Sequence, residues 1–139
     1  MNAPALLRRL RAVSFDKVHI DDAFWSPRLA INRTRTIPHE YMMCKETGRI
    51  DAFLLDWRPG QEPVPHYFWD SDVAKWVEAA SYSLATHPDP ELEALLDEVV
   101  NKIASAQQPD GYLNIYFTVV APEKRWKNLG MWHELYCAG

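Results

Sequence analysis

The spacing of apolar positions predicts two consecutive helices in the middle of the chain. Apolar residues recur at steps of three and four from Val73 to Leu84, and the same period continues from Leu92 to Ala106. His87-Pro-Asp-Pro90 interrupts the pattern, because proline lacks a backbone donor and restricts the residue before it. Asp70 or Ser71 is expected to cap the first helix. Joined by so short a break, the two helices should form an antiparallel αα-hairpin.

The N-terminal half carries weaker signals. Alternating apolar and polar residues over Phe15–Ile20 predict a short half-buried strand. Ser26-Pro27 predicts the start of a helix that runs toward Glu46, and Pro38 is expected to kink or split it. Thr47-Gly48 is expected to end this helix, because glycine adopts the left-handed conformation at little steric cost.

The segments that flank the hairpin lack helical periodicity. Prolines over residues 50–69 exclude a regular helix there, although the segment is rich in aromatic residues. Residues 107–111 have the composition of a turn, and residues 112–120 are expected to be irregular or extended. Residues 132–139 resemble the first turns of a further helix, with Trp132 and Tyr136 on one face. The predicted fold class is mostly α.

Composition narrows the class of protein. The chain has 139 residues, of which 47% are hydrophobic and 24% charged, as in an ordinary globular protein. A net charge of −4 and scattered basic residues argue against nucleic acid as a partner. No apolar stretch is long enough for a membrane span, so no membrane partner is expected. Two cysteines and the lack of an export signal favour a reduced, cytoplasmic setting.

Few groups in the sequence indicate a particular chemistry. The chain has no glycine-rich phosphate loop and no nucleophile elbow, which removes support for nucleotide binding and serine hydrolysis. Cys44 and Cys137 lack the close spacing of zinc or redox motifs. From the residues alone, no metal site is predicted.

Three residues are candidates for binding a sugar. Trp69 lies in an aromatic run, and aromatic rings pack against the C–H faces of sugars while carboxylates such as Asp70 bind hydroxyls. The alternative is that Asp70 only caps a helix and that the aromatic residues belong to the core. His133 can exchange hydrogen bonds with a hydroxyl, or it can be a structural histidine.

Five motifs in order resemble glycoside hydrolase family 127, the β-L-arabinofuranosidase family. They extend from about residue 15 to the last residue, and an ordered set is far more specific than one short match. The motifs are Asp22-Ala-Phe-Trp25-Ser-Pro-Arg28, Glu46-Thr-Gly-Arg49-Ile-Asp51, the segment from Phe68-Trp-Asp-Ser-Asp-Val-Ala-Lys-Trp76 to Ala80, Ala106-Gln-Gln-Pro-Asp-Gly-Tyr-Leu113 and His133-Glu-Leu-Tyr136.

The resemblance implies an (α/α)6 toroid followed by β-sandwich domains, and removal of terminal β-L-arabinofuranose from glycans by a retaining mechanism. In that family the nucleophile is a zinc-bound cysteine and a glutamate serves as acid and base. These groups lie further along the family sequence, so no catalytic residue and no zinc ligand is assigned here. His133 matches a substrate-contacting histidine of the family, and Asp70 and Trp69 are further candidates for the wall of the pocket.

The expected domain organisation follows from this match. Residues 1–14 form a flexible arm, and residues 15–139 form the first αα-hairpins of the toroid, incomplete in this chain. Alone, the chain is expected to be inactive and to need a complementary C-terminal fragment. The alternatives are a non-catalytic helical module that binds a sugar or a protein, and an inactive remnant of a truncated gene.

Overall fold

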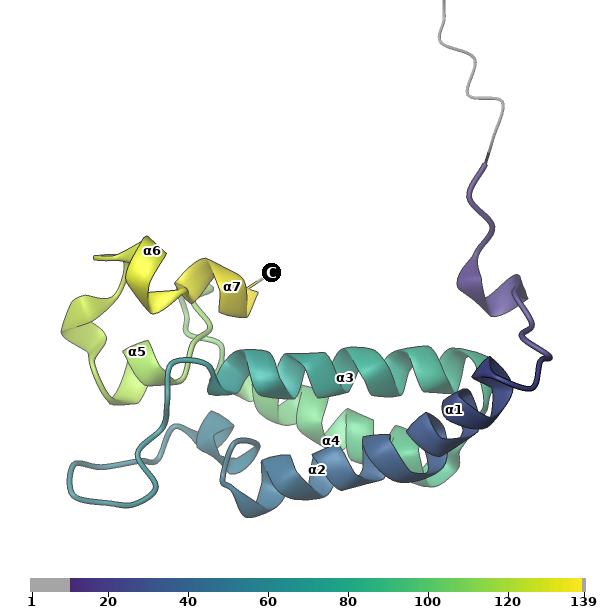
Figure 1. Cartoon of the computed structure of the whole chain (residues 1–139). Coiled ribbons are helices and arrows are strands. Elements are labelled where there is room, and N and C mark those ends of the chain that lie inside the picture. The colour runs from purple at the N-terminus through teal and green to yellow at the C-terminus, as the bar shows by residue number, and fades with distance from the viewer. Residues whose placement is uncertain (1–10, 139) are drawn as a thin grey trace, which may run out of the picture.

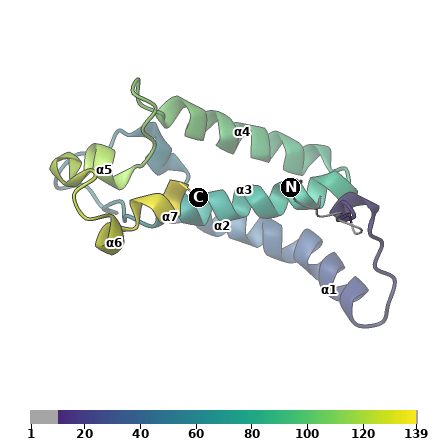
Figure 2. The same cartoon turned by 90° about the horizontal axis from the view of Figure 1, so that it is seen from above.

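Two long helices dominate the computed structural model, which describes residues 11–138. Helix α3 (Trp69–Thr86) and helix α4 (Pro90–Ala106) lie side by side, as Figures 1 and 2 show. Asp89 caps α4 by accepting hydrogen bonds from the backbone of Glu91 and Leu92. The predicted αα-hairpin is therefore confirmed, with α3 lying between α4 and the N-terminal helices (Figure 2).

The N-terminal helices form one interrupted run beside α3. Helix α1 (Trp25–Ile31) passes through a π-helical turn, η2 (Asn32–Thr36), into α2 (Ile37–Glu46), so the predicted break near Pro38 is confirmed. The helix begins earlier than predicted, because Asp22 accepts a hydrogen bond from the Phe24 N–H at 2.8 Å. Beyond α2, Gly48 has a φ of 80°, as expected at the end of this helix.

Two expectations for the segments before α3 have different outcomes. The predicted strand over Phe15–Ile20 is wrong: the segment holds a 3-10 turn, η1 (Phe15–Lys17), and every residue in it is exposed. Alternation of apolar and polar residues did not make a strand because residues 11–138 contain no neighbouring strand to pair with this segment. Before α3 begins at Trp69, residues 50–68 contain only the short 3-10 helix η3 (Asp51–Leu54), which confirms that the segment is not a regular helix. Of the expected arm, residues 11–14 are exposed and the first ten residues lie outside the described range.

The segment after α4 is more helical than predicted. The turn at residues 107–111 is confirmed, since the Gly111 N–H donates to the Gln108 carbonyl at 2.8 Å. Residues 112–120 were expected to be irregular, but they contain helix α5 (Tyr116–Val119), followed by η4 (Pro122–Lys124). The final expected helix is two short ones, α6 (Leu129–Trp132) and α7 (Glu134–Ala138), of which α7 packs against α3.

Buried apolar side chains from α2, η3, α3 and α4 form the core. Trp76 and Val99 are buried in it, and the Trp76 Nε1–H donates to the Ile37 carbonyl at 3.0 Å. Around this core, Asp51 accepts from Lys45 and Lys102 at 2.7 and 3.0 Å, which joins η3 to α2 and α4. The Trp76 hydrogen bond joins α3 to the start of α2. None of the helices within residues 11–138 combines the length and apolar character that a bilayer crossing requires.

Candidate functional site

A cavity of about 540 Å³ lies at the N-terminal end of α3. The loop before α3, the first turns of α3 and the segment from α6 to α7 contribute to its wall. Its lining residues are Arg49, His66, Phe68, Trp69, Ser71, Asp72, Lys75, His133 and Tyr136. The volume is in the range of small-molecule sites. Trp69 and His133, both predicted from the sequence, therefore lie in the wall of one cavity.

Aromatic rings form one side of this cavity. Phe68 lies 5.3 Å from the His133 ring and 6.1 Å from the Tyr136 ring, measured between centroids. Trp69 is 8% exposed, and the Arg49 guanidinium carbon lies 5.4 Å from its ring centroid. Such rings present apolar faces to a ligand while their neighbours supply polar groups.

Charged groups that the sequence analysis did not name as site candidates also line this cavity. The Arg49 Nε–H donates to Asp72 Oδ2 at 3.0 Å, and both side chains remain partly exposed. Lys75 Nζ lies 5.1 Å from the Tyr136 ring centroid, and a hydrogen bond with Tyr136 raises the pKa of Lys75. These residues lie inside the quoted motifs, so motif membership was the signal available for finding them. Donors and a carboxylate so close to aromatic rings suit a ligand rich in hydroxyl groups.

Asp70 occupies a different place from the predicted one. It is 6% exposed, and both carboxylate oxygens accept a hydrogen bond from the Ile115 N–H at 3.0 and 3.1 Å. Burial raises the pKa of Asp70 to about 6, and the Ile115 hydrogen bond partly offsets that rise. Asp70 does not cap α3, whose first turn contains it, nor is Ser71 the cap. Asp70 anchors the segment after α4 to α3 and is absent from the cavity lining.

His133 lies at the break between α6 and α7. Its φ of 52° is left-handed, and so is the φ of 62° at Trp126. For residues other than glycine this conformation costs about 1–2 kcal/mol each, so neighbouring contacts must hold it. The predicted single helix with Trp132 and Tyr136 on one face is therefore wrong, because the chain changes direction at His133.

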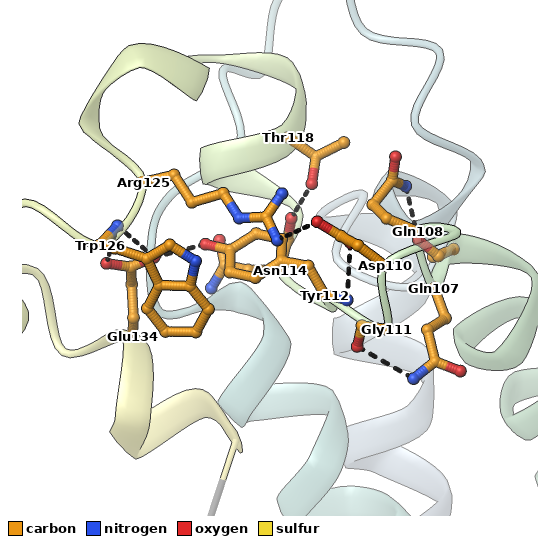
Figure 3. Close-up of polar contacts among 11 residues, drawn as sticks. Gln107, Gln108, Asp110, Gly111, Tyr112, Asn114, Thr118, Arg125, Trp126 and Glu134 are labelled. Carbon is orange, nitrogen blue, oxygen red and sulfur yellow. Dashed lines mark hydrogen bonds and ion pairs between the residues drawn. The ribbon is translucent and has the colours of Figure 1, made fainter.

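Glu134, next to His133, is buried and fully engaged in hydrogen bonds (Figure 3). It accepts from the Tyr112 hydroxyl at 2.5 Å and from the Trp126 N–H at 3.0 Å. The Arg125 guanidinium carbon lies 3.5 Å from the Tyr112 ring centroid, and Arg125 also pairs with Asp110 at 2.7 Å. Burial and the Glu134 hydrogen bond both raise the pKa of Tyr112, so its hydroxyl remains a donor.

The described residues do not fit a zinc site. No group of three or more histidine, cysteine or acidic residues is placed to hold a metal within residues 11–138. Burial raises the pKa of the Cys44 thiol, and it raises that of Cys137 to about 11, whereas a zinc ligand must be a thiolate. The Cys137 thiol instead lies 3.2 Å from the Tyr67 carbonyl. That zinc ligands lie outside this chain stays a prediction.

Comparison with known proteins identifies the family. Residues 17–139 match the model for the β-L-arabinofuranosidase GH127 catalytic domain. The non-reducing end β-L-arabinofuranosidase of Bifidobacterium longum subsp. longum is 49% identical over 76 residues, which cover 52% of this chain and 12% of that protein.

Two solved structures resemble the fold. The GH127 β-L-arabinofuranosidase of Geobacillus stearothermophilus T6 has a TM-score of 0.78 at 41% identity, over 86% of this chain and 20% of that one. A second GH127 β-arabinofuranosidase has a TM-score of 0.80 at 37% identity, over 88% of this chain and 21% of that one. The chain thus spans about a fifth of the length of these solved relatives, and its helices are the first hairpins of their (α/α)6 toroid. The chain belongs to the GH127 family of β-L-arabinofuranosidases.

Proposed function

We propose that this chain supplies one wall of the sugar pocket of an exo-acting β-L-arabinofuranosidase that removes terminal L-arabinofuranose. The observation that carries the proposal is the cavity at the start of α3, where the rings of Phe68 and Trp69 meet the polar side chains of Arg49, Asp72 and His133. The named activity of the GH127 relatives supplies the substrate class.

The geometry assigns the groups complementary tasks. The aromatic side offers apolar faces for sugar C–H groups, and Arg49 and Asp72 offer a donor and an acceptor for hydroxyls. His133 is exposed beside Phe68, so its imidazole is free to exchange hydrogen bonds with a hydroxyl. Binding and orientation are the roles proposed for this chain, and the steps that break the glycosidic bond belong to groups supplied from outside it.

A chimera tests this proposal. In the Geobacillus stearothermophilus relative, the matching N-terminal segment is replaced by this chain, which is 41% identical to it. We expect the purified chimera to hydrolyse p-nitrophenyl β-L-arabinofuranoside. His133→Ala should lower its kcat/KM by about tenfold, the effect of losing one hydrogen bond worth about 1.4 kcal/mol.

His87→Ala is the matched control, because His87 is an exposed histidine at the other end of α3 and should leave kcat/KM unchanged. A chimera that melts cooperatively but shows no hydrolysis would contradict the proposal. Equal kcat/KM values for the His133→Ala chimera and its parent would contradict the role of His133.

A complementary C-terminal fragment is a partner consistent with the same proposal. The aromatic cavity is present in the chain without it, which also favours a second candidate, a sugar-binding module without catalysis. The two candidates differ in one result. Mixing the chain with the remainder of the relative should restore hydrolysis under the first and only sugar binding under the second.

A further inference from the structure

Glu134, the residue after His133, contacts two other segments of the chain. Through the Trp126 N–H, at 3.0 Å, it holds the stretch that leads into α6. Through the Tyr112 hydroxyl, at 2.5 Å, it is tied to the turn after α4. A buried carboxylate with two donors fixes the backbone around it, because leaving any of these groups unpaired is costly. The residue next to it, His133, therefore has little freedom to change its backbone conformation.

The left-handed conformation of His133 decides where its imidazole lies. The His133 carbonyl accepts from the Tyr136 N–H at 3.0 Å, so α7 starts there in a new direction. With a right-handed φ at His133, α6 and α7 would merge into one helix, and the ring would leave Phe68. The centroid distance of 5.3 Å between His133 and Phe68 depends on this break.

We propose that Glu134 is a positioning residue for His133. By binding Tyr112 and Trp126 it holds His133 in the left-handed conformation that keeps the imidazole in the cavity wall, and the functional part of this inference rests on the proposed sugar pocket. Arg125 supports the arrangement, since its guanidinium stacks on the Tyr112 ring, lies 5.8 Å from the Trp126 ring centroid and pairs with Asp110.

The spectroscopic test uses the full chain labelled with 13C-histidine. His133→Ala identifies the His133 signal among the five histidines. We expect a nuclear Overhauser effect between the His133 and Phe68 rings in the wild type and in Glu134→Gln, whose amide oxygen can still accept a hydrogen bond. Glu134→Leu should abolish this signal and leave the signals of His19, His39 and His87 unchanged, because these three histidines are not in the cavity lining. Glu123→Gln, the control in the segment that leads to Trp126, should retain it because Glu123 is exposed and is not a partner of Glu134.

A double-mutant cycle on the Kd for a sugar distinguishes a positioning role of Glu134 from a general loss of structure. Methyl β-L-arabinofuranoside is titrated into the same samples, and its Kd is followed by the backbone amide signals of α7. Glu134→Leu should raise the Kd about tenfold in the wild-type background and leave it unchanged in the His133→Ala background, because contacting residues are coupled. Tyr112→Phe removes only one of the two donors to Glu134, so it should raise the Kd by less than Glu134→Leu does. Tyr112→Phe takes the place of Glu134→Leu in this cycle if Glu134→Leu does not fold.

The outcomes separate the two proposals. A retained Phe68–His133 signal in folded Glu134→Leu, or the same rise in Kd in both backgrounds, would overturn the positioning role. A signal that disappears as expected while no sample binds the sugar would support the positioning role and contradict the sugar pocket.

Discussion

Replacing Asp70 with asparagine should change how the stability of this protein depends on pH. Burial raises the Asp70 pKa from its ordinary 3.8 to about 6 in the folded chain. Between these values the folded state holds a proton that the unfolded state has released, so the stability that Asp70 contributes is greatest below the unfolded pKa and falls as pH rises to about 6. A rise of this size corresponds to about 3 kcal/mol lost across the interval.

Asparagine keeps an oxygen that accepts the Ile115 N–H and does not ionise, so the variant lacks this dependence. We expect the free energy of unfolding of Asp70→Asn to rise relative to the wild type by about 2 kcal/mol between about pH 4 and pH 7. Urea unfolding followed by tryptophan fluorescence at several pH values measures it.

Asp51→Asn is the control. The hydrogen bond from Lys45 lowers the Asp51 pKa below 3.8, so the stability that Asp51 contributes is lost only as pH falls below that value. The difference in the free energy of unfolding between Asp51→Asn and the wild type should therefore stay nearly constant between about pH 4 and pH 7. If the free energy of unfolding of Asp70→Asn relative to the wild type stays constant or falls as pH rises, the reasoning is refuted.

Three further predictions concern single contacts. Asp89→Ala removes the cap of α4 and should lower the free energy of unfolding by about 1 kcal/mol in urea titrations, with the exposed Asp97→Ala as a neutral comparison. Val99→Ala in the core should cost about 2 kcal/mol in the same assay, from about 0.8 kcal/mol for each buried methylene-sized group plus the cavity left behind. Burial raises the Cys137 pKa to about 11, so its thiol should react with a disulfide reagent near pH 8 far more slowly in the folded chain than in urea. Equal reaction rates in the two states would contradict the burial of Cys137.

The parts of the fold that sequence predicted are those set by local signals. Apolar periodicity indicated α3 and α4, and Gly48 marked the end of α2 because a left-handed residue is needed there. The prediction of a strand over Phe15–Ile20 was wrong because alternating apolar and polar residues allow one face of a strand to be buried but do not supply the partner strand that it needs. The start of α3 was misplaced because the side chain of Asp70 is used by Ile115, a contact that no nearby residue reveals.

The residues of the candidate site were likewise predicted only in part from the sequence. Trp69 and His133 came from motif order and from side-chain chemistry, and the structure brings both into one cavity. Arg49 and Lys75 were missed because membership of a motif does not say which of its residues line a cavity, and the two come together only in the fold. The role of Glu134 depends on Tyr112, more than twenty residues away, and on a backbone conformation at His133 that sequence does not encode visibly.

The most direct test of the central claim is a crystal structure of the chimera with L-arabinose bound. The account predicts the sugar in the cavity at the start of α3, with a ring face on Phe68 or Trp69 and a hydroxyl within hydrogen-bonding distance of the His133 imidazole. A sugar bound in the enzyme without any contact to these three residues would contradict it.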